Sequence, residues 1–565
     1  MESPFASRLG TTFIPSDEEV VEIRKILDEQ IPKLAHISSE LARVKALYEE
    51  LENQHKQLVD DMDAHRKLLS LPRRNLLPTD VLQEIFLSCL PINHDSIITK
   101  KEAPILLTQV CGSWRRIALN TPLLWASIHI PINPPFLRAA GDETATELRM
   151  MRRVTAVREW LSRSKDCPLS FTFGSNPNTV GPYQHCDDII SLLLLRLTRW
   201  RRVSISASKY YVAIFMALDG RRMPLLESIT IRDLGEGGWS STVTNAEICS
   251  SQLSLFENPN LRTLTMFYLT QDITSLPVRW AALSHLSLHH NLGPVEVHQI
   301  FDLLKSCTRL VTFHLGAEFH TFTPILSSNQ PNFQSSADTV VSLPFLEKFS
   351  LYYHTEVVCP DIFDSLELPA LREINYHWIH RSSAQPPLLS LLRKQGHSIA
   401  TLNTNIGFFS EESFRSCLRC CPHLKKLAIV PLRAPGMDGD ESTRTTDIGL
   451  LESFSSSSSG EYLCPELEVL ESSLATVSSD QDVLDFLTRK QAGTLPGLSK
   501  MKSLGLIFSR EQKQPMAEFV RPYIEEGLDL GLAYRFLDDR GISVYDHLPI
   551  DLDVLPERSP GPALF

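Results

Sequence analysis

Three thiols and one imidazole near residue 420 form a cluster of side chains of the kind that bind metal ions. Cys417, Cys420 and Cys421 are followed by His423, and zinc sites are built from such sulfur and nitrogen ligands. A structural zinc site also needs a second pair of ligands at a suitable spacing, and the sequence carries none near this cluster. We therefore expect reduced thiols at the end of a buried helix and no metal site.

Sequence motifs of the common catalytic machineries are missing. The chain has no Walker glycine loop, no nucleophile elbow, no HExxH zinc motif and no kinase signature. The dipeptide His289-His290 stands alone. The sequence predicts a protein without catalytic residues or cofactors that is not an enzyme. A metal- or nucleotide-dependent enzyme is the least favoured alternative.

Composition narrows the class of protein. The chain has 565 residues, of which 43% are hydrophobic and 22% charged. Eleven scattered cysteines indicate reduced thiols and a cytoplasmic or nuclear location. No secretory signal opens the chain, and the most apolar run, Ile189 to Leu197, is far shorter than the ~20 residues of a membrane span. We expect no membrane partner.

The charge balance narrows the class of partner. The formal net charge is −12, whereas binding to nucleic acid draws on an excess of positive charge. The one basic segment, Arg149 to Lys165, carries an apolar stripe at helical spacing, which predicts a helix with its arginines in solvent. A nucleic-acid partner is therefore not expected.

A weak internal repeat, a short L-x-x-L-x-L pattern, recurs from about residue 160 onward. Most spacings between copies lie near the period of leucine-rich repeats, although the consensus asparagine is missing. We therefore predict an α/β solenoid of irregular leucine-rich repeats over residues 126–545, with a disordered insertion over 432–462 and one helix beside each strand. A compact α/β domain is the alternative. The first apolar anchors of the copies are Trp200, Leu226, Leu261, Leu283, Leu310, Leu346, Leu371, Ile399, Leu424, Leu467 and Met501.

The outward side of these strands supplies a candidate binding face. In L-x-x-L-x-L the leucines point into the core, so the residue between the last two leucines and the one after them point outward. These outward residues are uncharged and rich in histidine and aromatic rings, which suits recognition of a protein substrate by hydrogen bonding and stacking. The candidate substrate-binding residues are Phe267, His289, His314, Tyr352, Asn375 and His377.

Residues 16–72 predict a long helix ahead of the repeats. Ser16 and Glu19 have the spacing of a capping box, and Pro32 predicts an interruption. From residue 34 to 69 apolar residues recur with heptad spacing, weakened by His55 and His65. Heptads do not name their partner, so this helix either associates with itself or packs on its own domain.

The stretch LPTDVLQEIFLSCL, residues 77–90, predicts a shorter amphipathic helix whose apolar residues share one broad face. Taken alone, it suits a core position as well as a docking surface. A second helix is predicted from Pro104 to Leu119, and a strand begins after Trp125.

Together these segments resemble an F-box, a three-helix motif that docks onto a Skp-type adaptor of a cullin–RING ubiquitin ligase. The resemblance covers about residues 75–125 and rests on Leu77-Pro78, Val81-Leu82, Ile85-Phe86, Val110-Cys111, Trp114-Arg115 and Trp125. The stretch Pro91 to Ala103 is longer than most members carry. By this resemblance, the candidate adaptor-binding residues are Leu77, Pro78, Val81, Leu82, Ile85, Phe86 and Trp114.

The order of heptad helix, F-box-like segment and repeat array is similar to that of the F-box proteins of mushroom-forming fungi. It implies a flexible N-terminus (1–15), a heptad helix (16–72), an F-box (75–125), a solenoid (126–545) and a C-terminal tail (546–565). The expected function is a non-catalytic substrate-recognition subunit of a Skp–cullin–F-box ubiquitin ligase. An oligomeric protein-interaction scaffold without ligase association is the alternative.

Overall fold

The fold is described from a computed structural model of the chain. It describes residues 4–11, 13–74, 77–132, 143–175, 184–233, 253–267, 273, 276–289, 303–316, 340–354, 360–379, 387–405, 409–430, 451, 454, 462–476, 478–491, 497–508, 510–537 and 543–547. Most of the insertion expected over 432–462 and of the tail expected over 546–565 lies outside these residues. Within them, no helix is both long enough and apolar enough to cross a membrane.

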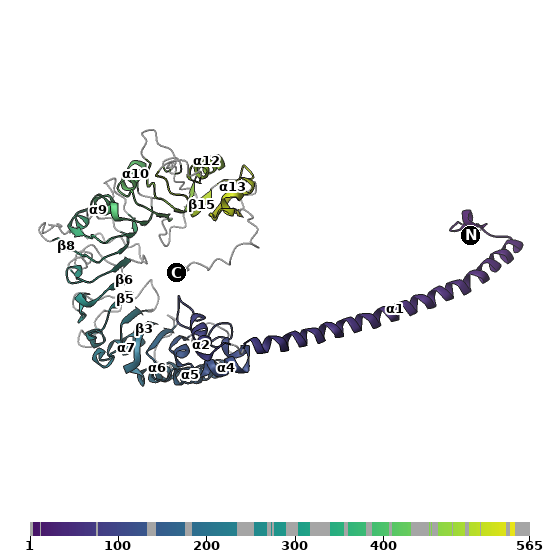
Figure 1. The fold of residues 1–565 in the computed structure, drawn as a ribbon, viewed down its shortest axis with the longest axis horizontal. Coiled ribbons are helices and arrows are strands. Elements are labelled where there is room, and N and C mark those ends of the chain that lie inside the picture. Colours follow the sequence, from purple (N-terminus) through teal and green to yellow (C-terminus); the bar gives the residue numbers. More distant parts are fainter. Residues whose placement is uncertain are drawn as a thin grey trace.

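After the 3-10 turn η1 (Ala6–Arg8), the chain forms one long helix, α1 (Asp17–Arg74). The capping box forms as expected, because the Ser16 N–H donates to Glu19 Oε2 (2.9 Å) and the Glu19 N–H donates to Ser16 Oγ (3.4 Å). The helix passes Pro32 without a break, so the expected interruption there is wrong; a single proline removes one helix hydrogen bond, which the turns on either side outweigh. Helix α1 extends away from the rest of the molecule (Figure 1).

Three short helices follow, α2 (Thr79–Ser88), α3 (Leu107–Val110) and α4 (Gly112–Leu119). The single helix expected from Pro104 to Leu119 is wrong, because Cys111 has extended backbone (φ −160°, ψ 170°) and separates α3 from α4. Cys111 instead starts α4, where its Sγ accepts a hydrogen bond from the Trp114 N–H (3.5 Å). The 3-10 turn η2 (Pro122–Trp125) then leads into the first strand.

A single large sheet makes up most of the remaining chain. Its strands follow one another in chain order, every neighbouring pair is parallel except the last, and together they form an arc with the strands on its inner side and the helices on its outer side (Figure 1). The strands of this sheet are β1 (Ser127–Ile132), β2 (Leu169–Ser175), β3 (Trp200–Ala207), β4 (Ser228–Asp233), β5 (Thr263–Phe267), β6 (His285–His289), β7 (Thr312–Gly316), β9 (Lys348–His354), β11 (Glu373–Ile379), β12 (Thr401–Thr404), β13 (Lys426–Ile429), β14 (Val469–Thr476), β15 (Ser503–Phe508), β16 (Asp529–Leu537) and β17 (Ser543–His547). Strands β8 (Val341–Ser342) and β10 (Leu366–Glu367) pair separately.

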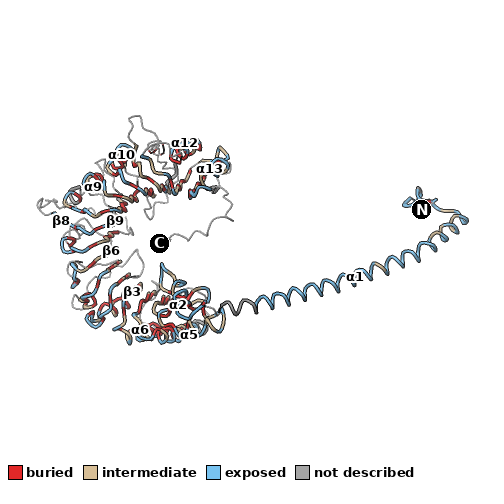
Figure 2. The backbone as a smooth tube through the Cα atoms, viewed as in Figure 1, coloured by how far each residue is buried: buried red, intermediate tan, exposed pale blue. Residues whose placement is uncertain are grey.

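The eleven sequence copies coincide with eleven consecutive strands of this sheet, β3 to β15, and all eleven first anchors are buried. Buried residues run along the strands of the arc from β1 to β16 (Figure 2). One-sided strands too small to stand alone thus share one continuous core. The L-x-x-L-x-L spacing therefore predicted the strands and the direction of their side chains.

The connections between strands differ in their local structure. In their described part, the crossovers from β4 to β6 hold the 3-10 turns η6 (Ser254–Glu257) and η8 (Trp280–Ala282). The crossover helices are α5 (Glu143–Arg163), α6 (Gln184–Leu194), α7 (Lys209–Met216), α9 (Pro387–Gln395), α10 (Glu411–Arg419), α12 (Asp480–Gln491) and α13 (Met516–Glu525). The basic helix α5 buries the stripe that its sequence predicted, Met150, Val154, Val157 and Leu161.

The stretch from Pro91 to Ala103 ties the short helices to the sheet. Asp95 accepts hydrogen bonds from the hydroxyls of Ser127 and Thr172, both at 2.7 Å. Ile97 forms a parallel bridge with His129, whose N–H donates to the Ser96 carbonyl (2.8 Å). Two strands of the sheet thereby fix the segment that precedes α3.

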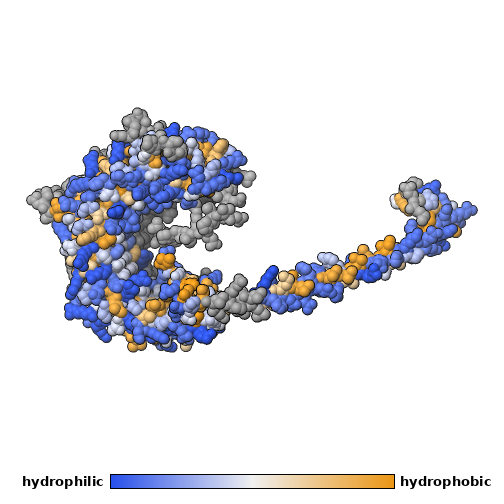
Figure 3. Space-filling model, viewed as in Figure 1, coloured by the Kyte–Doolittle hydropathy of each residue, from blue (hydrophilic) through white to orange (hydrophobic). Residues whose placement is uncertain are grey.

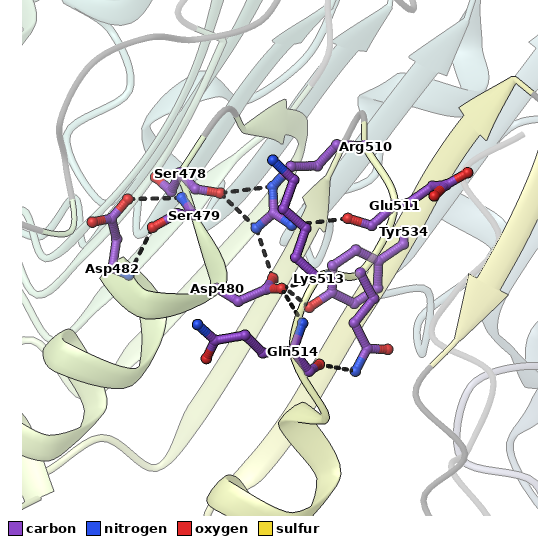
Figure 4. Close-up of polar contacts among 10 residues, drawn as sticks. Ser478, Ser479, Asp480, Asp482, Arg510, Glu511, Lys513, Gln514 and Tyr534 are labelled. Carbon is purple, nitrogen blue, oxygen red and sulfur yellow. Dashed lines mark hydrogen bonds and ion pairs between the residues drawn. The ribbon is translucent and has the colours of Figure 1, made fainter.

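A buried carboxylate ties together the last turns of the arc (Figure 4). Asp480 accepts hydrogen bonds from Arg510 Nη2 (2.7 Å), the Tyr534 hydroxyl (3.0 Å) and the N–H groups of Lys513 (2.7 Å) and Gln514 (3.0 Å). Burial raises the pKa of Asp480, but these hydrogen bonds lower it more, so its pKa lies below the usual value. This network is fully paired, and we assign it a structural role.

Candidate functional site

Six side chains from six adjacent strands stack into one continuous row on the inner side of the arc. The Arg232 guanidinium lies 3.9 Å from the centroid of Phe267, and Phe267 stacks on His289 at 4.0 Å with an interplanar angle of 8°. His289 to His314 is 4.4 Å and His314 to Tyr352 is 5.1 Å between centroids. We call this row the strand-face ladder. Its members are Arg232, Phe267, His289, His314, Tyr352 and His377, the last pair stacked at 4.3 Å.

The strand register explains why the ladder is continuous. Phe267 lies opposite His289, and Tyr352 lies opposite His377, but the residue between His289 and Tyr352 in this row is Gly316. The ring of His314, two residues earlier on the same strand, occupies the space that Gly316 leaves. A Cβ at Gly316 would lie 2.9 Å from His289 Nδ1 and 3.0 Å from His314 Nε2. The missing side chain therefore lets five rings stack in sequence.

The three ladder histidines are neutral at physiological pH. Burial lowers the pKa of His289 to about 3, with further lowering from His314 and Arg232. Burial also lowers the pKa of His314 to about 4, helped by Lys348, and the pKa of His377 to about 4, helped by His314. Each ring thus presents one N–H donor and one nitrogen acceptor, so the ladder suits hydrogen bonding and stacking better than the pairing of charges.

Beside the ladder lies a second row of polar side chains, which is more buried than its sequence suggested. Asn375 Nδ2 donates to Ser350 Oγ (2.9 Å) and to Glu373 Oε1 (3.1 Å). Ser350, Asn375 and Asn405 are buried. The expectation that Asn375 projects openly from the face is therefore wrong, because Asn375 lies two residues before His377 on β11, beside the longer side chains of the ladder. Asn375 is therefore a support for the neighbouring row and a weak candidate for direct contact.

Three buried polar atoms at the end of the ladder lack a hydrogen-bond partner in the part of the chain that the structure describes. They are His377 Nε2 on β11 and the side-chain oxygens of Asn403 and Asn405, on and just after β12. Buried polar atoms are nearly always paired. This end of the ladder thus has unused hydrogen-bonding capacity.

The seven candidate adaptor-binding residues divide into a buried set and an exposed set. Leu82 and Phe86 are buried in the core, and Trp114 packs on Phe86 with 4.8 Å between ring centroids. By contrast, Leu77 (45% exposed), Val81 (41%) and Ile85 (40%) lie at successive spacings of four, so they form one outward apolar stripe. Pro78 is exposed at the N-cap of α2.

Two further exposed apolar residues, on the segment of α3, were not among the candidates. Leu106 precedes α3 and Val110 ends it, and both side chains are exposed. Arg232 was not predicted as part of the ladder, because the candidate residues were all uncharged. Its place just after the copy LLESITI matches that of Phe267 after NLRTLTM, and this correspondence could have identified it.

The cysteines Cys417, Cys420 and Cys421 lie at the end of α10. Cys417 and Cys421 are buried, and burial raises the pKa of Cys417 to about 12 and that of Cys421 further. His423 instead pairs with Glu466 (2.7 Å). Among the described residues no group of three or more histidine, cysteine, aspartate or glutamate side chains is arranged to hold a metal ion. The protonated thiols behave as small apolar core groups.

Comparison with known proteins leaves this geometry as the basis for function. No model of a known protein family matches the chain, and no curated protein matches it either.

Proposed function

We propose that this protein is a non-catalytic substrate receptor of a Skp–cullin–F-box ubiquitin ligase. In this proposal, α2 to α4 form an F-box that docks onto the Skp-type adaptor. The sheet, as an irregular leucine-rich-repeat solenoid, presents a protein substrate to the ligase. The resemblance of residues 75–125 to an F-box motivates the proposal, and the two-faced character of α2 is the observation that carries it.

Helix α2 carries apolar residues on two faces, of which only one packs into the core. Leu82 and Phe86 already bury the helix against α4 and η2, yet Leu77, Val81 and Ile85 place further apolar surface in solvent. Apolar side chains that lie together on the surface of a protein often mark a site where a partner binds. Because the inner face is satisfied, the outer stripe supports docking by a partner.

The strand-face ladder supports the second half of the proposal. Its rings offer large, rigid contact areas with few rotatable bonds, which are the side chains that dominate protein interfaces. Arg232 adds a cation at one end, and the unpaired atoms of His377, Asn403 and Asn405 add hydrogen-bonding capacity at the other. A substrate segment with its own exposed aromatic and amide groups suits this row.

Co-expression with a Skp-type adaptor tests the docking step. We expect wild-type protein to recover the adaptor, and Val81→Asp/Ile85→Asp to recover at least about tenfold less, because two carboxylates would be desolvated in the interface. The matched control is Leu195→Asp, since Leu195 is also exposed but lies after α6. Equal adaptor recovery by all three proteins would overturn the proposal.

The same experiment separates the alternative function, an oligomeric scaffold without a ligase. The exposed stripe of α1 favours that alternative, because a long apolar seam in solvent indicates a protein partner. A scaffold would self-associate yet recover no adaptor even as wild type.

A further inference from the structure

Helix α1 leaves a long apolar stripe uncovered. From residue 27 to residue 67 every side chain of the helix is exposed except Glu40, which is half-buried. Figure 2 shows the helix pale along this length, and Figure 3 shows apolar side chains gathered along it. The helix therefore does not fold back on the described part of its own chain, which was one of the two alternatives for it. Its apolar exposed residues include Leu27, Leu34, Ile37, Leu41, Val44, Tyr48, Leu51, Leu58 and Met62.

These residues occupy the two seam positions of a heptad repeat. With Leu34 at position a, position a continues through residues 27, 41, 48, 55 and 62, and position d through residues 30, 37, 44, 51, 58 and 65. The seven-residue spacing continues over 39 residues, with polar residues at positions 30, 55 and 65 of the seam, and spans about 58 Å of helix. A seven-residue period of this length indicates a left-handed coiled coil.

We propose that α1 pairs with α1 of a second copy of this chain in a parallel, in-register coiled coil. Three polar seam residues, Gln30, His55 and His65, favour this orientation. In the parallel dimer each meets its own copy, so polar groups share a layer. In the antiparallel arrangement that overlaps the stripe fully, they would face Met62, Ile37 and Leu27, and each would lose hydration without gaining a partner.

Charges beside the seam also match in the parallel register. Position g of one helix approaches position e of the next heptad on the other. This pairs Glu40 with Lys45 and Asp61 with Arg66 across the dimer, and every g–e pair from Lys33 to Arg66 is free of like charges. Complementary g and e charges set partner choice and orientation.

The dimer has a consequence for the rest of the molecule. A parallel coiled coil places both copies of α2 to α4 and both sheets at the same end of the rod. Two equivalent binding faces near each other raise the effective concentration for a partner with two sites. The inference does not depend on the proposed function, because it would hold for a receptor and for a scaffold.

Analytical ultracentrifugation of the full chain tests the pairing. We expect wild type to sediment as a dimer, and Leu41→Glu/Leu51→Glu to dissociate at concentrations roughly a thousandfold higher, because four leucines leave the seam. The control Ser39→Glu/Asn53→Glu carries the same charges at position f on the outer face and should remain dimeric. A wild-type monomer, or equal dissociation of the two variants, would overturn the proposal.

Disulfide trapping tests the orientation. Leu41→Cys should form an intermolecular disulfide under mild oxidation, since residues 41 of the two copies share a layer only in the parallel register. Ser39→Cys points away from the seam and serves as the control, with wild type as the reference for native cysteines such as the exposed Cys89. A dimer in which Leu41→Cys gives no more crosslink than Ser39→Cys would contradict the parallel arrangement.

Discussion

Burial keeps the ladder histidines neutral well below pH 6.5, and this makes the stability of the strand face sensitive to acid. In the unfolded chain each imidazole takes up a proton near pH 6.5, whereas in the folded ladder their pKa values lie at about 3 for His289 and about 4 for His314 and His377. Between these values the unfolded state binds more protons than the folded state. The free energy of unfolding contributed by these groups therefore falls as the pH is lowered from 6.5 toward 4.

The effect is large enough to measure. Lowering the pH from 7 to 5 should cost about 2 kcal/mol for each ladder histidine. The double variant His289→Phe/His377→Phe keeps the stacked rings but removes two of these groups, so its loss of stability over the same range should be smaller by roughly 4 kcal/mol. Urea unfolding at the two pH values measures this difference. An identical pH dependence for wild type and variant would show that the histidines are not held neutral.

The sequence predicted most residues of the ladder, but not that their rings stack in one uninterrupted row. The period of two along each strand predicted which side of the strand carries Phe267, His289, Tyr352 and His377. It could not predict that the His314 ring would shift into the row left empty by Gly316, because that depends on the register of three neighbouring strands. Burial of Ser350, Asn375 and Asn405 was missed for the same reason.

The most direct test of the ladder among the elements is a substitution at Gly316, the last residue of strand β7. Gly316→Ala adds a Cβ that would crowd His289 and His314, so it should separate the stack and destabilise the protein by about 1–3 kcal/mol. The matched control is Gly505→Ala on β15, where the nearest atoms lie 3.9 Å from the added Cβ. That variant should be neutral or slightly stabilising.

Thermal unfolding of both glycine variants gives the comparison. A loss confined to Gly316→Ala supports a packed ladder. Equal effects of the two substitutions would mean that the ring stack contributes little to the structure of this face.

The elements themselves were predicted unevenly. Strands with L-x-x-L-x-L spacing and the amphipathic helix α5 were predictable because one buried face sets a strong period. The helix expected from Pro104 to Leu119 was not predicted correctly, because the extended backbone at Cys111 lets its sulfur accept from Trp114 and restart the helix. The 3-10 turns of the middle crossovers have no strong sequence period, and the attachment of Asp95 to Ser127 and Thr172 depends on a contact across the fold.

Across the whole molecule, helix α1, helix α2 and the strands that carry the ladder occupy different parts of the chain, with α1 extended away from the arc (Figure 1). The rigid sheet and the bonded segment around Asp95 fix the second relative to the third. In the proposed receptor, this separation lets the adaptor and a substrate bind the same chain at once.

Hydrogen–deuterium exchange of the full chain with and without a Skp-type adaptor is the most direct test of the proposed docking through α2 to α4, because it locates the contact in the folded protein. We predict slower exchange in α2 (Thr79–Ser88) and in residues 106–119 when the adaptor is present, and unchanged exchange in strands β5 to β11. Unchanged exchange throughout α2 to α4 at saturating adaptor, or protection confined to the strands, would contradict it.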